Sequence, residues 1–165
     1  MKLCLYFVFL VLLSNNPEIT DIRKLYSSVV NSESNANEFA SKLNEITNDD
    51  NKILVAYKGA SIIILSKYEK KNSEKSKIFK EGANMLEFAI TSEPNNIEIR
   101  LIRLSIQEKV PKILNYNINK NEDRNFLLEH YKEVSGNLKT YIKNFMMQSK
   151  SFSNEEKQMI NEWKK

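Results

Sequence analysis

A polar stripe on one expected helix carries the side chains best suited to binding chemistry in this chain. The stripe consists of Asn96, Arg100, Arg103 and Gln107. Successive members are separated by four, three and four residues, which places them on one face of a helix. Ile97, Leu101 and Leu104 flank the stripe on one side, and isoleucines 99, 102 and 106 flank it on the other. We therefore expect a largely buried helix whose guanidiniums meet carboxylates, carbonyls or an open groove.

Two interpretations of the two arginines follow from this pattern. The first is internal pairing, since buried charges are normally paired, and the candidate partners are Glu87, Glu93 and Glu98. The second is a concave groove in which Arg100 and Arg103 hold a carboxylate of a peptide or another acidic ligand. Tyr57 and Lys58 would line that groove if the helices stack as they do in repeat proteins. The candidate binding residues are Arg100, Arg103, Asn96, Gln107, Tyr57 and Lys58.

Residues for catalysis or metal binding are sparse. His130 is the single histidine, which excludes a zinc site built from several histidines. Neither a nucleophile motif of the Gly-x-Ser-x-Gly type nor a glycine-rich phosphate loop occurs. We therefore predict no catalytic residues, no metal and no cofactor. The predicted function is non-enzymatic binding of a protein or peptide, and the alternative is an enzyme that uses carboxylates from distant helices.

The amino terminus resembles a secretory signal. Lys2 precedes eleven consecutive apolar residues, Leu3–Leu13, and the chain then turns polar. That run is shorter than the roughly 20 residues that span a bilayer. Only one of the two small residues expected before a cleavage site is present, at Ser14, and Cys4 lies inside the apolar run. We expect residues 1–16 to be a signal peptide and the protein to be periplasmic or secreted, with no stable membrane span after removal.

The elements that must position the stripe are predicted to be helices. Three glycines and three prolines in 165 residues favour long helices over a turn-rich β fold. Apolar spacing and capping residues predict about eight helices and no strand within a single α-helical domain, 17–165. Residues 52–70 are apolar almost all round and should be central. Expected helix boundaries include caps at Asn35, Asn96, Asn119 and Ser153 and a stop at Gly136.

The charge pattern argues against a nucleic-acid partner. The formal net charge is +4, and charged residues make up 28% of the chain. Basic and acidic residues alternate rather than forming a basic stripe with interspersed aromatics. We interpret the charges as a solvated surface.

One segment resembles the second helix of a tetratricopeptide repeat. Gly82, Leu86, Ala89 and Pro94 have the spacing of that helix, and Gly59 could serve as the small residue of the first helix. The spacing of 23 residues between the two glycines is longer than in that family. The resemblance implies antiparallel hairpins in a degenerate repeat array, and an irregular helical bundle is the alternative. Segments 54–60 and 96–103 also resemble small exported proteins of Bacteroidetes-type bacteria, which implies no particular activity.

Overall fold

The fold is all-helical, as predicted. The computed structural model describes residues 16–29 and 31–163. Over these residues the chain forms eight α-helices and two short 3-10 helices, and no strand. The helices are α1 (Ile19–Ser28), α2 (Glu33–Ser41), α3 (Lys52–Ser66), α4 (Asn72–Ser92), α5 (Ile97–Gln107), η1 (Lys112–Leu114), α6 (Lys120–His130), η2 (Tyr131–Glu133), α7 (Gly136–Gln148) and α8 (Asn154–Glu162). The predicted signal peptide lies outside the described residues except at its last position, Asn16.

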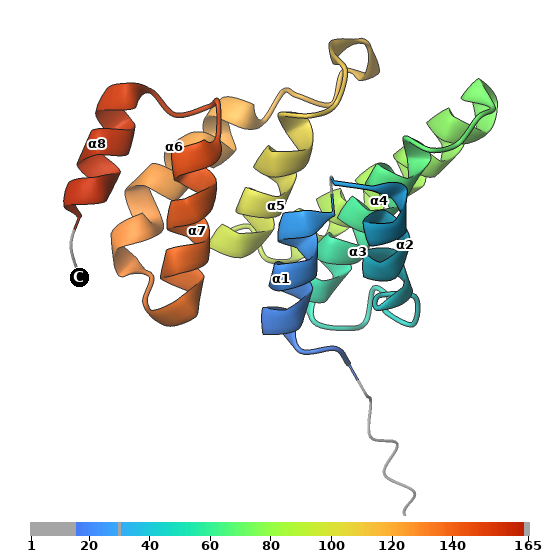
Figure 1. Ribbon diagram of the computed structural model, residues 1–165, viewed down its shortest axis with the longest axis horizontal. Coiled ribbons are helices and arrows are strands. Elements are labelled where there is room, and N and C mark those ends of the chain that lie inside the picture. Colours follow the sequence, from blue (N-terminus) through green and yellow to red (C-terminus); the bar gives the residue numbers. More distant parts are fainter. Residues whose placement is uncertain (1–15, 30, 164–165) are drawn as a thin grey trace, which may run out of the picture.

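Helix α5 stands between two groups of helices. Figure 1 shows α1–α4 on one side of α5 and α6–α8 on the other. A large hydrophobic cluster is formed by α1–α5 and the turns between them. A small hydrophobic cluster joins α5 to α6–α8. The two clusters therefore meet at α5, which belongs to both.

The sequence of α5 explains why it can join two cores. Ile99, Ile102 and Ile106 pack into the large cluster. Leu101 and Leu104 pack into the small cluster. The two apolar flanks predicted on either side of the polar stripe are thus confirmed, and each flank packs into a different core. Arg100, Arg103 and Gln107 of the stripe lie between them and are buried with them, whereas Asn96, at the start of the helix, is half-buried.

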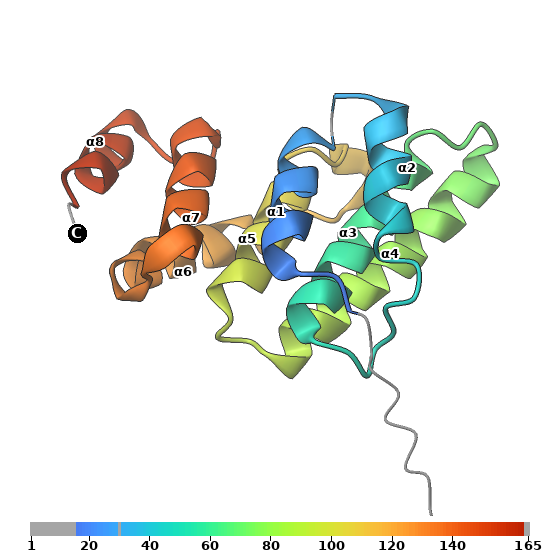
Figure 2. The ribbon, with the colours of Figure 1, turned by 60° about the horizontal axis from the view of Figure 1, so that its bottom comes forward.

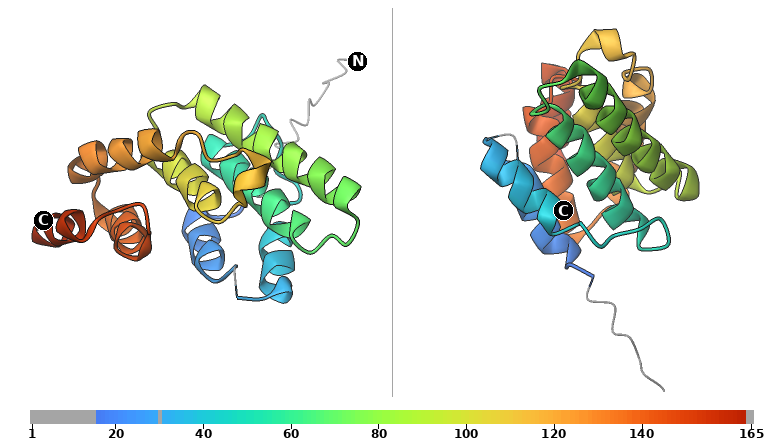
Figure 3. Two further views of the ribbon diagram at one scale, coloured as in Figure 1. Left: turned by 90° about the horizontal axis from the view of Figure 1, so that it is seen from above. Right: turned by 90° about the vertical axis from the view of Figure 1, so that its right-hand side faces the viewer.

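Helices α3 and α4 form a closely packed hairpin. Figure 3 shows α4 running along α3, and the two share the most extensive helix contact in the described chain. A Cβ added to Gly82 would lie 2.6 Å from the backbone oxygen of Gly59, and one added to Gly59 would lie 2.7 Å from that of Gly82. Both positions therefore require glycine because the backbones touch there. Helices α1 and α2 cover α3 on one side (Figure 2).

Helix boundaries follow the capping predictions at some positions and depart from them at others. Asn96 caps α5, and Ser153 forms a capping box with Glu156 at the start of α8, as predicted. Helix α2 is capped by Ser32 rather than Asn35, because the Ser32 hydroxyl accepts a hydrogen bond from the Asn35 amide. Gly136 has a positive φ of 62°, but it is the first residue of α7, so the helix stop predicted there is wrong.

The two ends of α6 differ in outcome. Asn119 occupies the N-cap position, as predicted, but its side chain makes no capping hydrogen bond, and its amide donates to Glu122 instead. The helix ends at His130, where one 3-10 turn follows, so it stops short of the boundary predicted at Gly136. Within residues 16–29 and 31–163, none of the helices combines the length and the apolar character needed to cross a bilayer.

Candidate functional site

The two arginines of the polar stripe are buried and paired inside the protein. Asp123, from the first turn of α6, accepts two hydrogen bonds from Arg103, at 2.7 Å from Nε and 2.7 Å from Nη2. Its carboxylate also accepts one from Arg100 Nη1 at 3.0 Å. The Asp123 side chain is 0% exposed. Such a two-pronged pair is the strongest arrangement available to an arginine and a carboxylate.

Further groups complete the arginine cluster, which we define as Arg100, Arg103, Glu87, Glu122 and Asp123. Glu122 pairs with Arg100 at 2.7 Å, and Glu87 pairs with Arg103 at 2.8 Å. The Arg100 guanidinium also lies 4.4 Å from the centre of the Phe126 ring. Two cations face three carboxylates, so the cluster has no surplus positive charge with which to attract an acidic ligand.

The pKa shifts in this cluster reflect burial opposed by pairing. Burial by itself would lower the pKa of Arg103, but hydrogen bonds and charges from Asp123 and Glu87 raise it above its ordinary value. Burial raises the pKa of the Asp123 carboxyl, and the two arginines oppose that shift. The hydrogen bond from Arg100 lowers the pKa of Glu122, which is more exposed.

The structure therefore confirms the internal pairing of Arg100 and Arg103, and neither guanidinium is left free to line the open groove that was the other interpretation. Of the predicted partners, Glu87 does bind Arg103. Glu93 instead accepts a hydrogen bond from the Asn96 amide, and Glu98 pairs with Arg23. The main partner, Asp123, was not predicted, because it lies 20 residues beyond Arg103 on another helix.

The other candidate binding residues also serve the fold. The side chain of Asn96 accepts hydrogen bonds from the first amides of α5. The Lys58 ammonium donates to the backbone oxygens of Asn44 and Ile46, which ties α3 to the turn after α2. Gln107 is buried, and both atoms of its side-chain amide lack a hydrogen-bond partner in the described chain. Neither of the two pockets described below is lined by these side chains or by the two arginines.

Tyr57 belongs to a second buried network, centred on Glu98. The Tyr57 hydroxyl donates to Glu98 at 2.8 Å and lies 3.2 Å from the Tyr141 hydroxyl. Arg23 donates to both oxygens of the same carboxylate. The hydrogen bond to Glu98 raises the pKa of Arg23 above its ordinary value. This network links α1, α3, α5 and α7 and is a structural feature of the interior.

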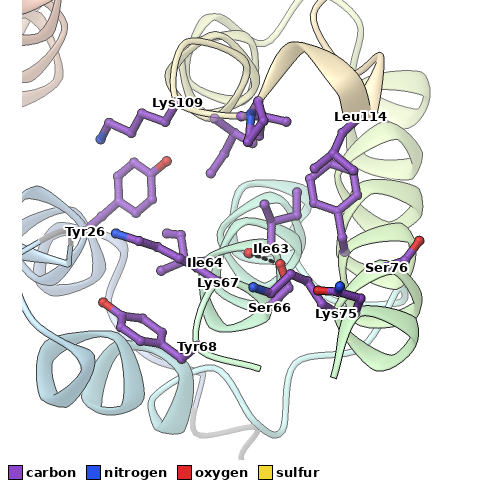
Figure 4. A pocket seen from close by; sticks show the side chains of 15 residues that line it. Tyr26, Ile63, Ile64, Ser66, Lys67, Tyr68, Lys75, Ser76, Lys109 and Leu114 are labelled. Atoms are coloured by element: carbon purple, nitrogen blue, oxygen red, sulfur yellow. Dashed lines mark hydrogen bonds between the residues drawn. The ribbon is translucent and has the colours of Figure 1, made fainter. Parts of the chain in front are cut away.

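A pocket of about 570 Å³ is the strongest candidate for a binding site. It lies at the end of α3, beside the start of α4 and the end of α5, with Tyr26 of α1 along one edge (Figure 4). Its walls are mainly apolar and include Ile63, Ile64, Phe79 and Ile106. Its volume falls in the range typical of small-molecule sites. None of the six residues predicted from the sequence lines it.

The polar groups at this pocket are mostly basic. Lys67, Lys75 and Lys109 line it, and no aspartate or glutamate does. Figure 4 shows Lys67 and Lys109 on the same side of the pocket as Tyr26. In the described chain, no carboxylate pairs with any of these three lysines. Desolvation lowers the pKa of Lys109, and the charge of Lys67 adds to that shift, while Glu108 opposes it.

A second hollow, of about 510 Å³, lies between α1, α5 and α7. Of its three cations, Arg23 binds Glu98 and Lys24 binds Asp21, and the third, Lys109, also lines the large pocket. It is the less suitable site for an anionic ligand because Lys109 is its one cation without a carboxylate partner in the described chain, whereas the large pocket has three such lysines.

The large pocket lacks the side chains that most often serve enzymes as acids, bases or thiol nucleophiles. Its lining contains no histidine, cysteine, aspartate or glutamate. His130 lies on the surface of α6 and pairs with Glu133 in the next turn. In the part of the chain that the structure describes, no three potential metal ligands come together. Comparisons with protein-family models, with curated proteins and with solved structures find no match to this chain.

Proposed function

We propose that this protein is an exported, non-enzymatic binding protein whose ligand site is the large pocket between α1, α3, α4 and α5. The observation that carries this proposal is a cavity of about 570 Å³ with mainly apolar walls and no histidine, cysteine, aspartate or glutamate in its lining. The arginine cluster and the Glu98 network support it indirectly, because Asp123 and Glu98 are held by arginines and are not free for acid–base work.

A protein or peptide partner, the ligand class predicted from the sequence, is one candidate ligand, and it would bind at this pocket rather than at the arginines. It would place apolar side chains in the pocket, against Ile63, Ile64 and Phe79. A small amphiphile is the second candidate. The pocket volume favours it, since cavities of this size usually hold one small molecule. The tetratricopeptide-like relationship of the α3–α4 hairpin also stays a proposal, supported by the contact between Gly59 and Gly82.

Binding of the neutral fluorescent dye Nile red tests whether the pocket accepts apolar groups at all. We expect saturable binding to the full chain and at least tenfold weaker binding to Ile64→Phe, which adds bulk at the pocket wall. Met159→Phe is the matched control, because it adds the same ring to a half-exposed position on α8. If Ile64→Phe does not fold, Leu114→Phe on η1 places the ring at the same pocket. Equal binding by all variants would contradict the proposal.

Export is tested separately by cell fractionation and intact-mass measurement. We expect a periplasmic or secreted species lighter than 19.3 kDa, the mass of the full chain, because residues 1–16 would be removed. A species of about 19.3 kDa in the membrane fraction would contradict a cleaved signal peptide.

A further inference from the structure

We propose that the large pocket binds a fatty carboxylate, with its single acyl chain against the apolar walls and its carboxylate between the ammonium groups of Lys67 and Lys109. This inference rests on the proposed function and extends it by naming the class of ligand. It selects the second of the two candidates above.

The distribution of charge is the first argument for an anionic head group. The lining includes three lysines and no acidic residue, so the pocket is positive as a whole. Lys67 and Lys109 lie on one side of the cavity (Figure 4), and their like charges repel each other. The Lys67 ammonium lies 5.7 Å from the centre of the Tyr68 ring, which keeps it near the pocket. A carboxylate between the two ammoniums would relieve their repulsion and gain two charge-assisted hydrogen bonds.

The apolar walls are the second argument, and they favour an acyl chain over a peptide. Ile63, Phe79 and Ile106 are almost fully buried apart from the surface that they present to the cavity. The Ser66 hydroxyl already donates to the backbone oxygen of Ile63. A peptide would bring amide and carbonyl groups that these walls cannot satisfy, whereas an acyl chain brings none.

Isothermal titration calorimetry of the full chain with four probes, and with octanoate as a chain-length comparison, tests the inference. The probes are decanoate, decan-1-ol, decyltrimethylammonium and N-acetylated trileucine with a free carboxyl terminus. We expect decanoate to bind about tenfold more tightly than decan-1-ol, as two partly exposed ion pairs would provide. We expect decyltrimethylammonium to bind more weakly than decan-1-ol. We expect the trileucine peptide to bind more weakly than decanoate. Octanoate should bind about 16-fold more weakly than decanoate, because each methylene removed costs about fourfold.

Two double variants assign the head-group contacts. Lys67→Gln/Lys109→Gln should bind decanoate and decan-1-ol equally. The matched control Lys42→Gln/Lys150→Gln removes the same charge from exposed residues outside the pocket and should keep the tenfold preference. Circular dichroism checks that each variant is folded.

The outcomes separate this inference from the proposed function. If none of the four probes binds, the pocket is not a ligand site and the proposed function is wrong as well. If decanoate and decan-1-ol bind equally to the wild type, the pocket is an apolar site and only the inference about the anion is wrong. The inference also fails if the Lys67→Gln/Lys109→Gln variant keeps its preference. Tighter binding of the trileucine peptide than of decanoate would assign the pocket to a peptide instead.

Discussion

Replacing Asp123 by asparagine should strongly destabilise the protein. The change keeps the shape of the side chain but removes the charge that binds two buried guanidiniums. Breaking a buried ion pair by removing one partner costs about 3–5 kcal/mol. Asparagine can still accept a hydrogen bond from Arg103, so we expect a loss near the lower end, about 3 kcal/mol. For a chain of this size, that loss corresponds to a fall in Tm of roughly 6–12 °C.

The assay is urea and thermal unfolding followed by helical circular dichroism. Glu122→Gln is the matched control, because Glu122 neighbours Asp123 in sequence and pairs with Arg100, but its side chain is 55% exposed. Solvent screening should limit the effect of that change to less than about 1 kcal/mol. A double-mutant cycle with Arg103→Gln should show a coupling energy of at least about 1 kcal/mol between Asp123 and Arg103. Equal effects of the two carboxylate variants would refute the claim that burial makes Asp123 the central partner.

Three further predictions concern the interior. Gln107→Met should raise the free energy of unfolding by about 1–2 kcal/mol, because it replaces a buried amide that makes no hydrogen bond. The exposed control Gln148→Met should change that free energy by less than about 0.5 kcal/mol, and urea unfolding measures both variants. Gly82→Ala should lower the free energy of unfolding by about 1–3 kcal/mol, since the new Cβ would lie 2.6 Å from a backbone oxygen of α3. The exposed control Asn84→Ala should be neutral or slightly stabilising. Burial raises the pKa of Tyr26 to about 12, so absorbance at 295 nm should show a tyrosine that ionises near pH 12 and is missing from Tyr26→Phe. The folded pKa of Tyr26 lies above the unfolded value of about 10, so the unfolded chain loses this proton at a lower pH than the folded chain does. The contribution of neutral Tyr26 to the free energy of unfolding is therefore complete below pH 10 and is lost as the pH rises toward 12.

Local signals predicted the helices well because a cap requires only a few neighbouring residues. The Asn96 side chain accepts hydrogen bonds from amides two and three positions later, and Ser153 and Glu156 bind each other's backbone amides. The cap at Asn35 was wrong for an equally local reason. Ser32 also carries a side-chain acceptor three residues earlier, and the helix begins there.

Burial of the polar stripe could be predicted, but its partners could not. The alternation of apolar residues around Arg100 and Arg103 already implied a helix covered on both sides. The choice between an internal pair and an open groove depends on Asp123, which lies across the interface between α5 and α6. A carboxylate in the first turn of a helix is common near a positive helix end, so nothing local distinguishes Asp123 from other acidic residues.

The candidate pocket depends entirely on tertiary packing. Its lining comes from α1, α3, α4, α5 and the segment after α5, and each contributes only a few side chains. In the sequence, the pocket was indicated only by the apolar residues 62–64, which extend around more of the helix than one buried face. The lysines at positions 67 and 109 are 42 residues apart in sequence and come together only because the ends of α3 and α5 do.

The sequence by itself therefore determined the helical class, several of the helix boundaries and the burial of α5, and it predicts an export signal. These properties depend on composition and on interactions within a few residues along the chain. Only the tertiary structure decided where the arginines find carboxylates, which cavity remains open and which lysines stay without an acidic partner in the described chain. Those outcomes depend on how helices far apart in sequence pack together, and apolar packing is non-directional, so no local pattern specifies them.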